Sequence, residues 1–166
     1  MADNSLFISK YTPNDFHAYH SLVMDDDVMR YISGTGLSEE DAQAKFNSIL
    51  SINAQQGSLG YFKVYNHQNT FIGDCKLERS KDSCPALEIG YILKKDFWGQ
   101  GYGTEICTRL LALAHQVAPT LDVVAIIDPE NTASKKLLKK CGFRSFFIGV
   151  ENGLATEKLI HSKISK

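Results

Sequence analysis

Phe97-Trp98-Gly99-Gln100-Gly101-Tyr102-Gly103-Thr104-Glu105 is the stretch that decides the fold, because it joins a predicted strand to a predicted amphipathic helix. Its three glycines allow the backbone to come close to a ligand. Successive backbone N–H groups and the positive end of a helix together form an anion site, so a phosphate or pyrophosphate is the expected ligand. A glycine turn with a purely structural role is the alternative interpretation.

Two well-known phosphate-binding motifs do not fit this stretch. A Walker loop ends in Gly-Lys-Ser/Thr, which is absent here. The Rossmann fingerprint has glycines at its first, third and sixth positions, whereas Gly99, Gly101 and Gly103 are at the first, third and fifth. A Rossmann motif also opens a parallel sheet, and the strands before this stretch are predicted to form an antiparallel meander.

The elements on either side of the stretch follow one continuous order. Before it, we predict a strand at residues 6–10, helices ending near Met24, Tyr31 and Gly57, and strands at 61–66, 71–78 and 86–93. After it, we predict a helix from Tyr102, a strand at 122–127, a helix at 132–140 and two strands around Asn152-Gly153. This order predicts an α+β domain with one β-α-β crossover in its second half.

Length and charge restrict the class of protein. The chain has 166 residues, which fits a single domain over 1–166. With 18 Lys plus Arg against 19 Asp plus Glu, the net charge of −1 argues against nucleic acid and membrane surfaces as partners. No apolar run approaches the ~20 residues of a membrane span, and no signal peptide is visible. We therefore expect a cytoplasmic protein, as a monomer or a homodimer.

The cysteines and histidines do not predict a metal site. No Cys-x-x-Cys spacing is present, and no third ligand lies near His17 and His20 in the sequence. In a reducing compartment the cysteines are interpreted as small buried hydrophobic residues. They are Cys75, Cys84, Cys107 and Cys141.

The glycine stretch and its surroundings resemble the GNAT superfamily of acetyl-CoA-dependent N-acetyltransferases. The family's loop ends in Gly-x-Gly or Gly-x-Ala at a helix start, as in Gly101-Tyr102-Gly103. Leu87-Glu88-Ile89-Gly90-Tyr91-Ile92-Leu93 is similar to its bent central strand, and Asn131-Thr132-Ala133-Ser134 through Cys141-Gly142-Phe143 is similar to its second cofactor-binding motif. The patterns at 25–31, 88–91 and 97–99 most resemble the branch that includes the ribosomal-protein-alanine N-acetyltransferases.

The resemblance implies a splayed mixed sheet of about seven strands, flanked by helices on both faces. Strands 88–93 and 123–127 would separate to admit the pantetheine arm of acetyl-CoA. Asn131 and the backbone of Tyr91, Ile92 and Leu93 would contact that arm. Backbone N–H groups would hold the pyrophosphate, from Trp98, Gly99, Gln100, Gly101, Tyr102, Gly103 and Thr104. Many other branches have Arg or Gln at the position of Trp98.

The implied reaction is direct attack of a primary amine, from a protein N-terminus or a small molecule, on the acetyl thioester. The amine must lose a proton before it attacks. Glu88 is the predicted proton acceptor: strand alternation places it on the face of Gly90, and a carboxylate in the centre of a covered sheet is unexpected without a task. A salt bridge or a solvated strand end is the alternative for Glu88.

Two further roles follow from the resemblance or from local charge. The departing CoA thiolate needs a hydrogen-bond donor, and because helix 132–140 has no Tyr, the resemblance assigns this role to Ser134. Asp26, Asp27 and Tyr31 are predicted to border the acceptor entrance and to attract cationic amines. Helix capping is the alternative for Asn131, Ser134 and the aspartates. Alternative functions are an acyl-CoA-binding module without turnover and a nucleotide site at the glycine loop.

Overall fold

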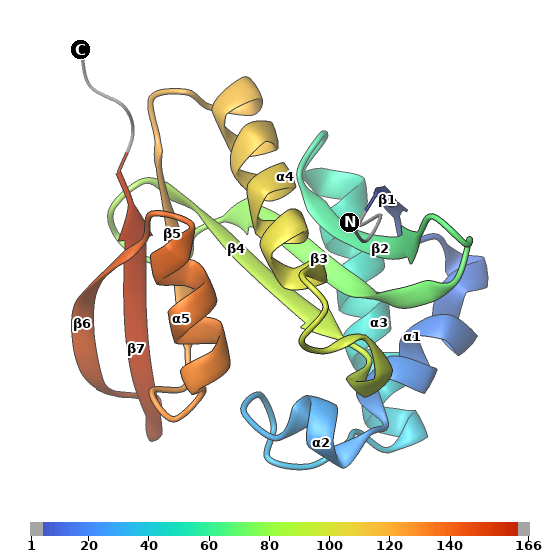
Figure 1. Cartoon of the computed structure of the whole chain (residues 1–166). Helices are drawn as coiled ribbons and strands as arrows, with labels where there is room; N and C mark the ends of the chain where they lie inside the picture. Colours follow the sequence, from blue (N-terminus) through green and yellow to red (C-terminus); the bar gives the residue numbers. More distant parts are fainter. Residues whose placement is uncertain (1–4, 163–166) are drawn as a thin grey trace.

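One seven-stranded sheet organises residues 5–162, the part of the chain that the computed structural model describes (Figure 1). Its strands are β1 (Leu6–Lys10), β2 (Gly60–Asn66), β3 (Phe71–Arg79), β4 (Ala86–Leu93), β5 (Asp122–Ile127), β6 (Arg144–Glu151) and β7 (Leu154–His161). The helices are α1 (Phe16–Val23), α2 (Asp26–Met29), α3 (Glu39–Gln55), α4 (Tyr102–Val117) and α5 (Thr132–Lys140), with 3₁₀ turns η1 (Pro13–Asp15) and η2 (Lys95–Phe97). The predicted element order and the α+β class are confirmed.

Local capping explains why the helices begin where the sequence predicts. The Ser38 hydroxyl accepts a hydrogen bond from the N–H of Asp41 at the start of α3. The Asp25 carboxylate accepts from the N–H groups of Asp27 and Val28 at the start of α2. These side chains satisfy donors that have no partner within a helix, so the helix starts can be read from neighbouring residues alone.

The sheet opens between its two central strands. Its order is β1-β2-β3-β4-β5-β7-β6, and every neighbouring pair is antiparallel except β4 and β5. These two pair in parallel only from Ala86 to Ile89, opposite Asp122 to Ala125. Beyond Ile89, no strand within residues 5–162 pairs with β4 on its β5 side, and the two ribbons separate in Figure 1. The predicted splay of the sheet is confirmed.

Both faces of the sheet are covered by helices. On one face, Ile106 and Leu110 of α4 pack in a core that includes Leu87 and Ile89 of β4. On the other face, α1 and α3 contribute a second core around Phe46, which is fully buried. Alternation along β4 therefore sends odd-numbered side chains toward α4 and even-numbered ones toward α3.

The cysteine prediction is partly wrong. Cys75 and Cys107 are buried as predicted, but Cys141 is only half-buried and Cys84 is exposed. Cys84 lies in the turn between β3 and β4, where the chain passes over the surface and cannot bury a small side chain. Within residues 5–162, no helix combines the length and apolar character needed to cross a bilayer.

Candidate active site

Two cavities adjoin where β4 and β5 diverge. The strand cavity, of about 280 Å³, is lined by β3 and β4, by the end of β5 and by parts of α3 and α5. The loop cavity, of about 530 Å³, is lined by the segment between β4 and α4 and by the start of α4. The two share six lining residues, which are Tyr31, Ile32, Tyr91, Ile92, Asn131 and Ser134. A ligand in one cavity can therefore reach the other.

The start of α4 supplies unpaired N–H groups to the loop cavity. Gly99 and Gly101 have φ values of +70° and +90°, a conformation that favours glycine. No side chain caps the helix, and its first hydrogen bond runs from the N–H of Glu105 to the carbonyl of Gly101, at 3.2 Å. The preceding N–H groups, including those of Tyr102 and Thr104, have no partner within the helix. They form a site suited to an anion.

Packing against neighbouring side chains also favours a glycine at position 103. A Cβ atom at this position would lie 2.6 Å from Leu137 Cδ1 and 3.4 Å from Tyr91 Cε2. A residue with a Cβ atom at this position would require the Leu137 side chain to move. A structural role in packing therefore applies at Gly103, and this residue also lines the loop cavity.

Trp98 lines the loop cavity, but its N–H groups already have protein partners. Its backbone N–H donates to the carbonyl of Lys95 at 3.1 Å, and its indole N–H donates to the carbonyl of Leu93 at 2.9 Å. The Trp98 backbone N–H and the Leu93 carbonyl are therefore already bonded within the protein. The Gln100 side chain donates to the carbonyl of Asp96 at 2.7 Å, so it too turns back onto its own loop.

A phenol from β4 lies beside the serine of α5. Tyr91 Oη and Ser134 Oγ are 3.4 Å apart, within hydrogen-bonding distance. Burial raises the pKa of the Tyr91 phenol, so the phenol stays protonated at neutral pH. Asn131 caps α5 by accepting from the N–H of Ser134 at 3.2 Å, as its alternative interpretation predicts, and also lines both cavities. The family pattern places a tyrosine in helix 132–140, whereas here the phenol next to Ser134 comes from strand β4.

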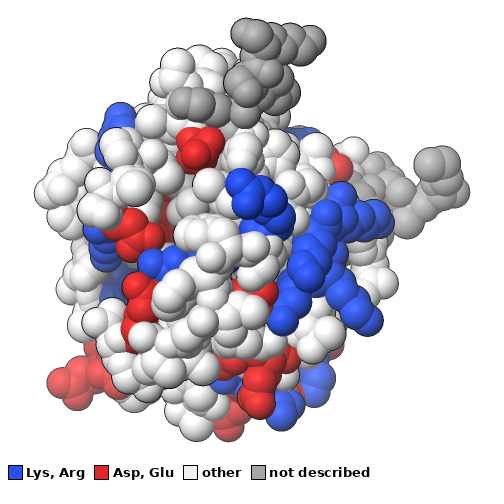
Figure 2. Space-filling view, turned by 90° about the vertical axis from the view of Figure 1, so that its left-hand side faces the viewer, with Lys and Arg blue, Asp and Glu red and all other residues white. Residues whose placement is uncertain are grey.

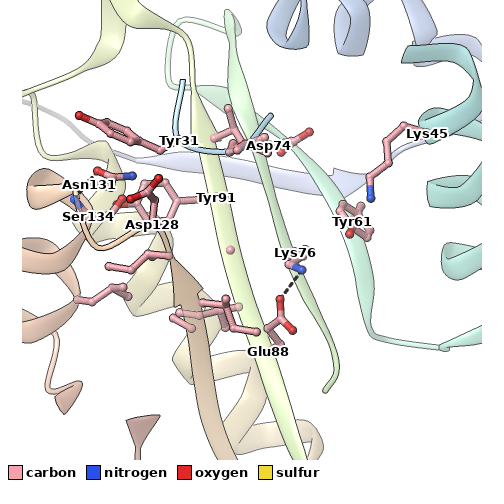
Figure 3. A pocket seen from close by; sticks show the side chains of 18 residues that line it. Tyr31, Lys45, Tyr61, Asp74, Lys76, Glu88, Tyr91, Asp128, Asn131 and Ser134 are labelled. Carbon is pink, nitrogen blue, oxygen red and sulfur yellow. Dashed lines mark hydrogen bonds and ion pairs between the residues drawn. The ribbon is translucent and has the colours of Figure 1, made fainter. Parts of the chain in front are cut away.

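Glu88 lies on the predicted face of β4 and is part of an ion pair. It lines the strand cavity with Gly90, while Leu87 and Ile89 point into the opposite core. Lys76 Nζ on β3 lies 2.6 Å from Glu88 Oε2, the contact drawn in Figure 3. The predicted orientation of Glu88 is confirmed, and the salt bridge considered as its alternative is also present.

Asp74 is a second carboxylate in the strand cavity, and sequence reasoning missed it. Its residue is only 4% exposed, and the Tyr11 hydroxyl donates to its Oδ2 at 2.9 Å. Burial raises the pKa of the Asp74 carboxyl to about 7, against the opposing effects of the Tyr11 hydrogen bond and the Lys45 and Lys76 charges. The reasoning that selected Glu88, an acid in a covered strand, applied equally to Asp74 in strand 71–78.

The structure places the three predicted acceptor residues, Asp26, Asp27 and Tyr31, in different surroundings. Tyr31 lines both cavities. Asp26 lines neither, and its Oδ1 accepts from the N–H of Gly36 at 2.8 Å. Asp27 borders the loop cavity and pairs with Lys95 at 2.6 Å, and this hydrogen bond lowers the pKa of its carboxyl. Neither carboxylate lines the strand cavity, because Asp26 is bound to the Gly36 N–H and Asp27 to the Lys95 ammonium.

Positive charge lies beside the loop cavity. The helix α5 carries Lys135, Lys136, Lys139 and Lys140, and Lys140 lines the loop cavity. Figure 2, which looks onto the side of the molecule with β6, β7 and α5, shows lysine and arginine side chains grouped on one part of this face. The sequence signal was two pairs of lysines in helix 132–140, and only the fold brings this helix beside the glycine loop.

Comparisons with known proteins agree with this geometry. Residues 5–144 match the model of a family described as "Acetyltransferase (GNAT) domain". The uncharacterized N-acetyltransferase YnaD of Bacillus subtilis is 25% identical over 139 residues, which cover 84% of this chain and 79% of YnaD. Two similar solved structures are a putative GNAT-family acetyltransferase from Bordetella pertussis (TM-score 0.80, 18% identity, 98% of each chain) and spermidine N-acetyltransferase from Vibrio cholerae in complex with CoA and spermine (TM-score 0.73, 20% identity, 95% and 96%).

Proposed function

Because this chain belongs to the GNAT acetyltransferase family, we propose that it transfers an acetyl group from acetyl-CoA to a primary amine. The observation that carries the proposal is the opening between β4 and β5 beside an uncapped helix start. An arm with amide groups can pair with the free strand edge, and a pyrophosphate can accept from the helix N–H groups.

The residues of the loop cavity fit the co-substrate. The N–H groups at the start of α4 and the Lys140 ammonium suit its phosphates. Tyr91 and Ile92 line the cavity from the strand that lacks a neighbour on its β5 side, and Asn131 lies where both cavities meet. We propose that Gly99 to Thr104 hold the pyrophosphate through the backbone, with Trp98 shaping the wall.

The acetyl transfer requires one proton acceptor and one donor for the leaving group. The amine nitrogen attacks the thioester carbonyl, the C–N bond forms, and the C–S bond breaks to release the CoA thiolate. We propose that the Ser134 hydroxyl donates a hydrogen bond to this sulfur, supported by the Tyr91 phenol 3.4 Å away. Of the three carboxylates that line the strand cavity, we consider two as acceptors of the amine proton: Glu88, the sequence prediction, and Asp74.

The strand cavity favours a small cationic acceptor. Its volume of about 280 Å³ suits a small amine or the first residue of a protein N-terminus. Asp74, Glu88 and Asp128 line it with carboxylates, against the two lysines Lys45 and Lys76. We propose an amine of this size as the acceptor; a ribosomal-protein N-terminal alanine stays one prediction within that class.

An amine-panel assay tests the proposal. The chain is mixed with acetyl-CoA and one amine at a time, among them polyamines, aminoglycosides and short peptides with a free N-terminus, and thiol release is followed. Amine-dependent release confirms acetyl transfer. If acetyl-CoA stabilises the fold, by about 2.7 kcal/mol at a hundred times its dissociation constant, but no amine stimulates release, the chain binds acyl-CoA without turnover. Thermal protection by ATP or NAD in place of acetyl-CoA would contradict both functions.

A further inference from the structure

Asp74 and Glu88 line the strand cavity on opposite sides of the Lys76–Gly90 pair. The register of β3 and β4 pairs Lys76 with Gly90, Asp74 with Ile92 and Glu78 with Glu88. Asp74 and Glu88 are therefore each two strand residues, about 7 Å, from the Lys76–Gly90 pair, on opposite sides of it. Figure 3 shows this arrangement, with Lys76 between the two carboxylates. Spacing alone does not distinguish them as proton acceptors.

Their partners do distinguish them. Oε2 of Glu88 is held by Lys76 Nζ at 2.6 Å, so a proton that arrives there must displace an ammonium group. Within residues 5–162, Asp74 forms no ion pair, and its one hydrogen bond is the one that Tyr11 donates to Oδ2. Oδ1 of Asp74 therefore has no hydrogen-bond partner in the described chain, and the residue lines the strand cavity.

The surroundings of Asp74 suit a group that alternates between charged and neutral forms. Burial raises its pKa to about 7, near the optimum for a base that works at neutral pH. Two phenols are next to Asp74: Tyr11, which precedes α1, and Tyr19, which lies in α1. Burial raises the pKa of both phenols, so both stay protonated. Lys45 on α3 and Lys76 on β3 act on it by charge, while Lys63, its register partner on β2, is paired with Asp15 at 2.9 Å.

We propose that Asp74 is the group that takes the proton from the acceptor amine, and that Tyr11 is the positioning residue that holds its carboxylate. This inference rests on the proposed acetyl transfer. The bound ammonium gives one proton to Asp74 and becomes a free amine, which attacks the thioester. The second nitrogen proton leaves as the C–S bond breaks and ends on the CoA sulfur, and Asp74 returns its proton to water. Glu88 and Lys76 then form a fixed ion pair that shapes the cavity.

The test is the pH dependence of kcat/KM for one acceptor amine, measured in matched variants. The acceptor's own titration is common to all of them, so differences between variants report groups of the protein. In the wild type we expect an acid limb near pH 7. The Tyr11 hydrogen bond and the Lys45 charge both favour the ionised form of Asp74. Tyr11→Phe removes the first, and Lys45→Met removes the second. Each should move this acid limb to higher pH. Glu88→Gln releases Lys76, whose charge favours the ionised Asp74, so it should keep the limb and not move it to higher pH.

Asp74→Asn should lower kcat by about 10²- to 10⁴-fold, the usual effect of losing a positioned base, while acetyl-CoA affinity stays close to that of the wild type. Infrared difference spectra supply a readout that needs no turnover: a protonated-carboxyl band should titrate near pH 7 and be absent in Asp74→Asn. If Asp74→Asn fails to fold, Tyr11→Phe and Lys45→Met still decide the question. A full rate in Asp74→Asn, or a limb unmoved in both other variants, overturns the inference alone. Absence of transfer in the wild type overturns the proposed function as well.

Discussion

Replacing Asp74 by Asn should stabilise the protein above pH 7 and change little near pH 4. The carboxyl has its pKa raised from 3.8 to about 7 by burial, so the folded state binds a proton more tightly than the unfolded chain does. Between these two pH values the folded state carries more protons. The contribution of Asp74 to the free energy of unfolding therefore falls as pH rises through this range. It is smallest above pH 7.

The magnitude follows from the size of the shift. A change of about three pKa units corresponds to about 4 kcal/mol. This is an upper limit for the gain at pH 8, because Asn keeps a polar side chain at the same buried position and still needs a hydrogen-bond partner. The Asn carbonyl can accept the Tyr11 hydrogen bond, so that contact survives in the variant. We expect a gain of about 2 kcal/mol or more at pH 8 and close to none at pH 4.

Urea denaturation at several pH values measures the effect. The informative quantity is the difference in unfolding free energy between Asp74→Asn and the wild type, plotted against pH. Asp96→Asn is the matched control, since Asp96 is exposed and the same substitution there removes an acid without removing a buried charge. A difference for Asp74→Asn that stays constant or shrinks from pH 4 to pH 8 would refute the reasoning.

Three further predictions concern the loop cavity and its helices. Gly101→Val should lower acetyl-CoA affinity more than about tenfold in calorimetry while circular dichroism stays native, because a branched side chain is strained at a φ of +90°; unchanged affinity would contradict this placement. Lys140→Ala should weaken binding about two- to fivefold at low salt and have no effect at high salt. Ser134→Ala should spare affinity but slow transfer, and the defect should shrink with a more acidic leaving thiol; equal defects with both thioesters would exclude the assigned role.

Local signals in the sequence predict the elements and much of the fold. Caps at Asp25 and Ser38 act within a few residues, so the helix starts they predict are the ones observed. Strand alternation likewise places Glu88 on the correct face of β4. The opening between β4 and β5 was inferred from the family resemblance, since hydrophobic patterns do not indicate where two parallel strands separate.

The details of the site depend on contacts that are distant in sequence. Asp74 meets Tyr11 across 63 residues, and the register of β3 and β4 sets it on the same face as Glu88. The indole of Trp98 turns back to the Leu93 carbonyl, which no motif anticipates. Tyr91 meets Ser134 because α5 packs over β4 after the crossover. Such partners need the three-dimensional arrangement, and they determine which groups remain open to a ligand.

The balance of charges on this sheet face explains why Asp74 is the acid without a cation. Lys76 lies 2.6 Å from Glu88 and 3.8 Å from Glu78, so it serves two carboxylates. Lys45 acts on Asp74 only through its charge, without an ion pair. With all three acids ionised the group carries one net negative charge, which attracts a cationic amine. When the ammonium gives its proton to Asp74, the charge of cavity and acceptor together is unchanged. Proton transfer to Asp74 therefore creates no new unpaired charge in this partly buried site. An apolar residue at position 74 could not accept the proton.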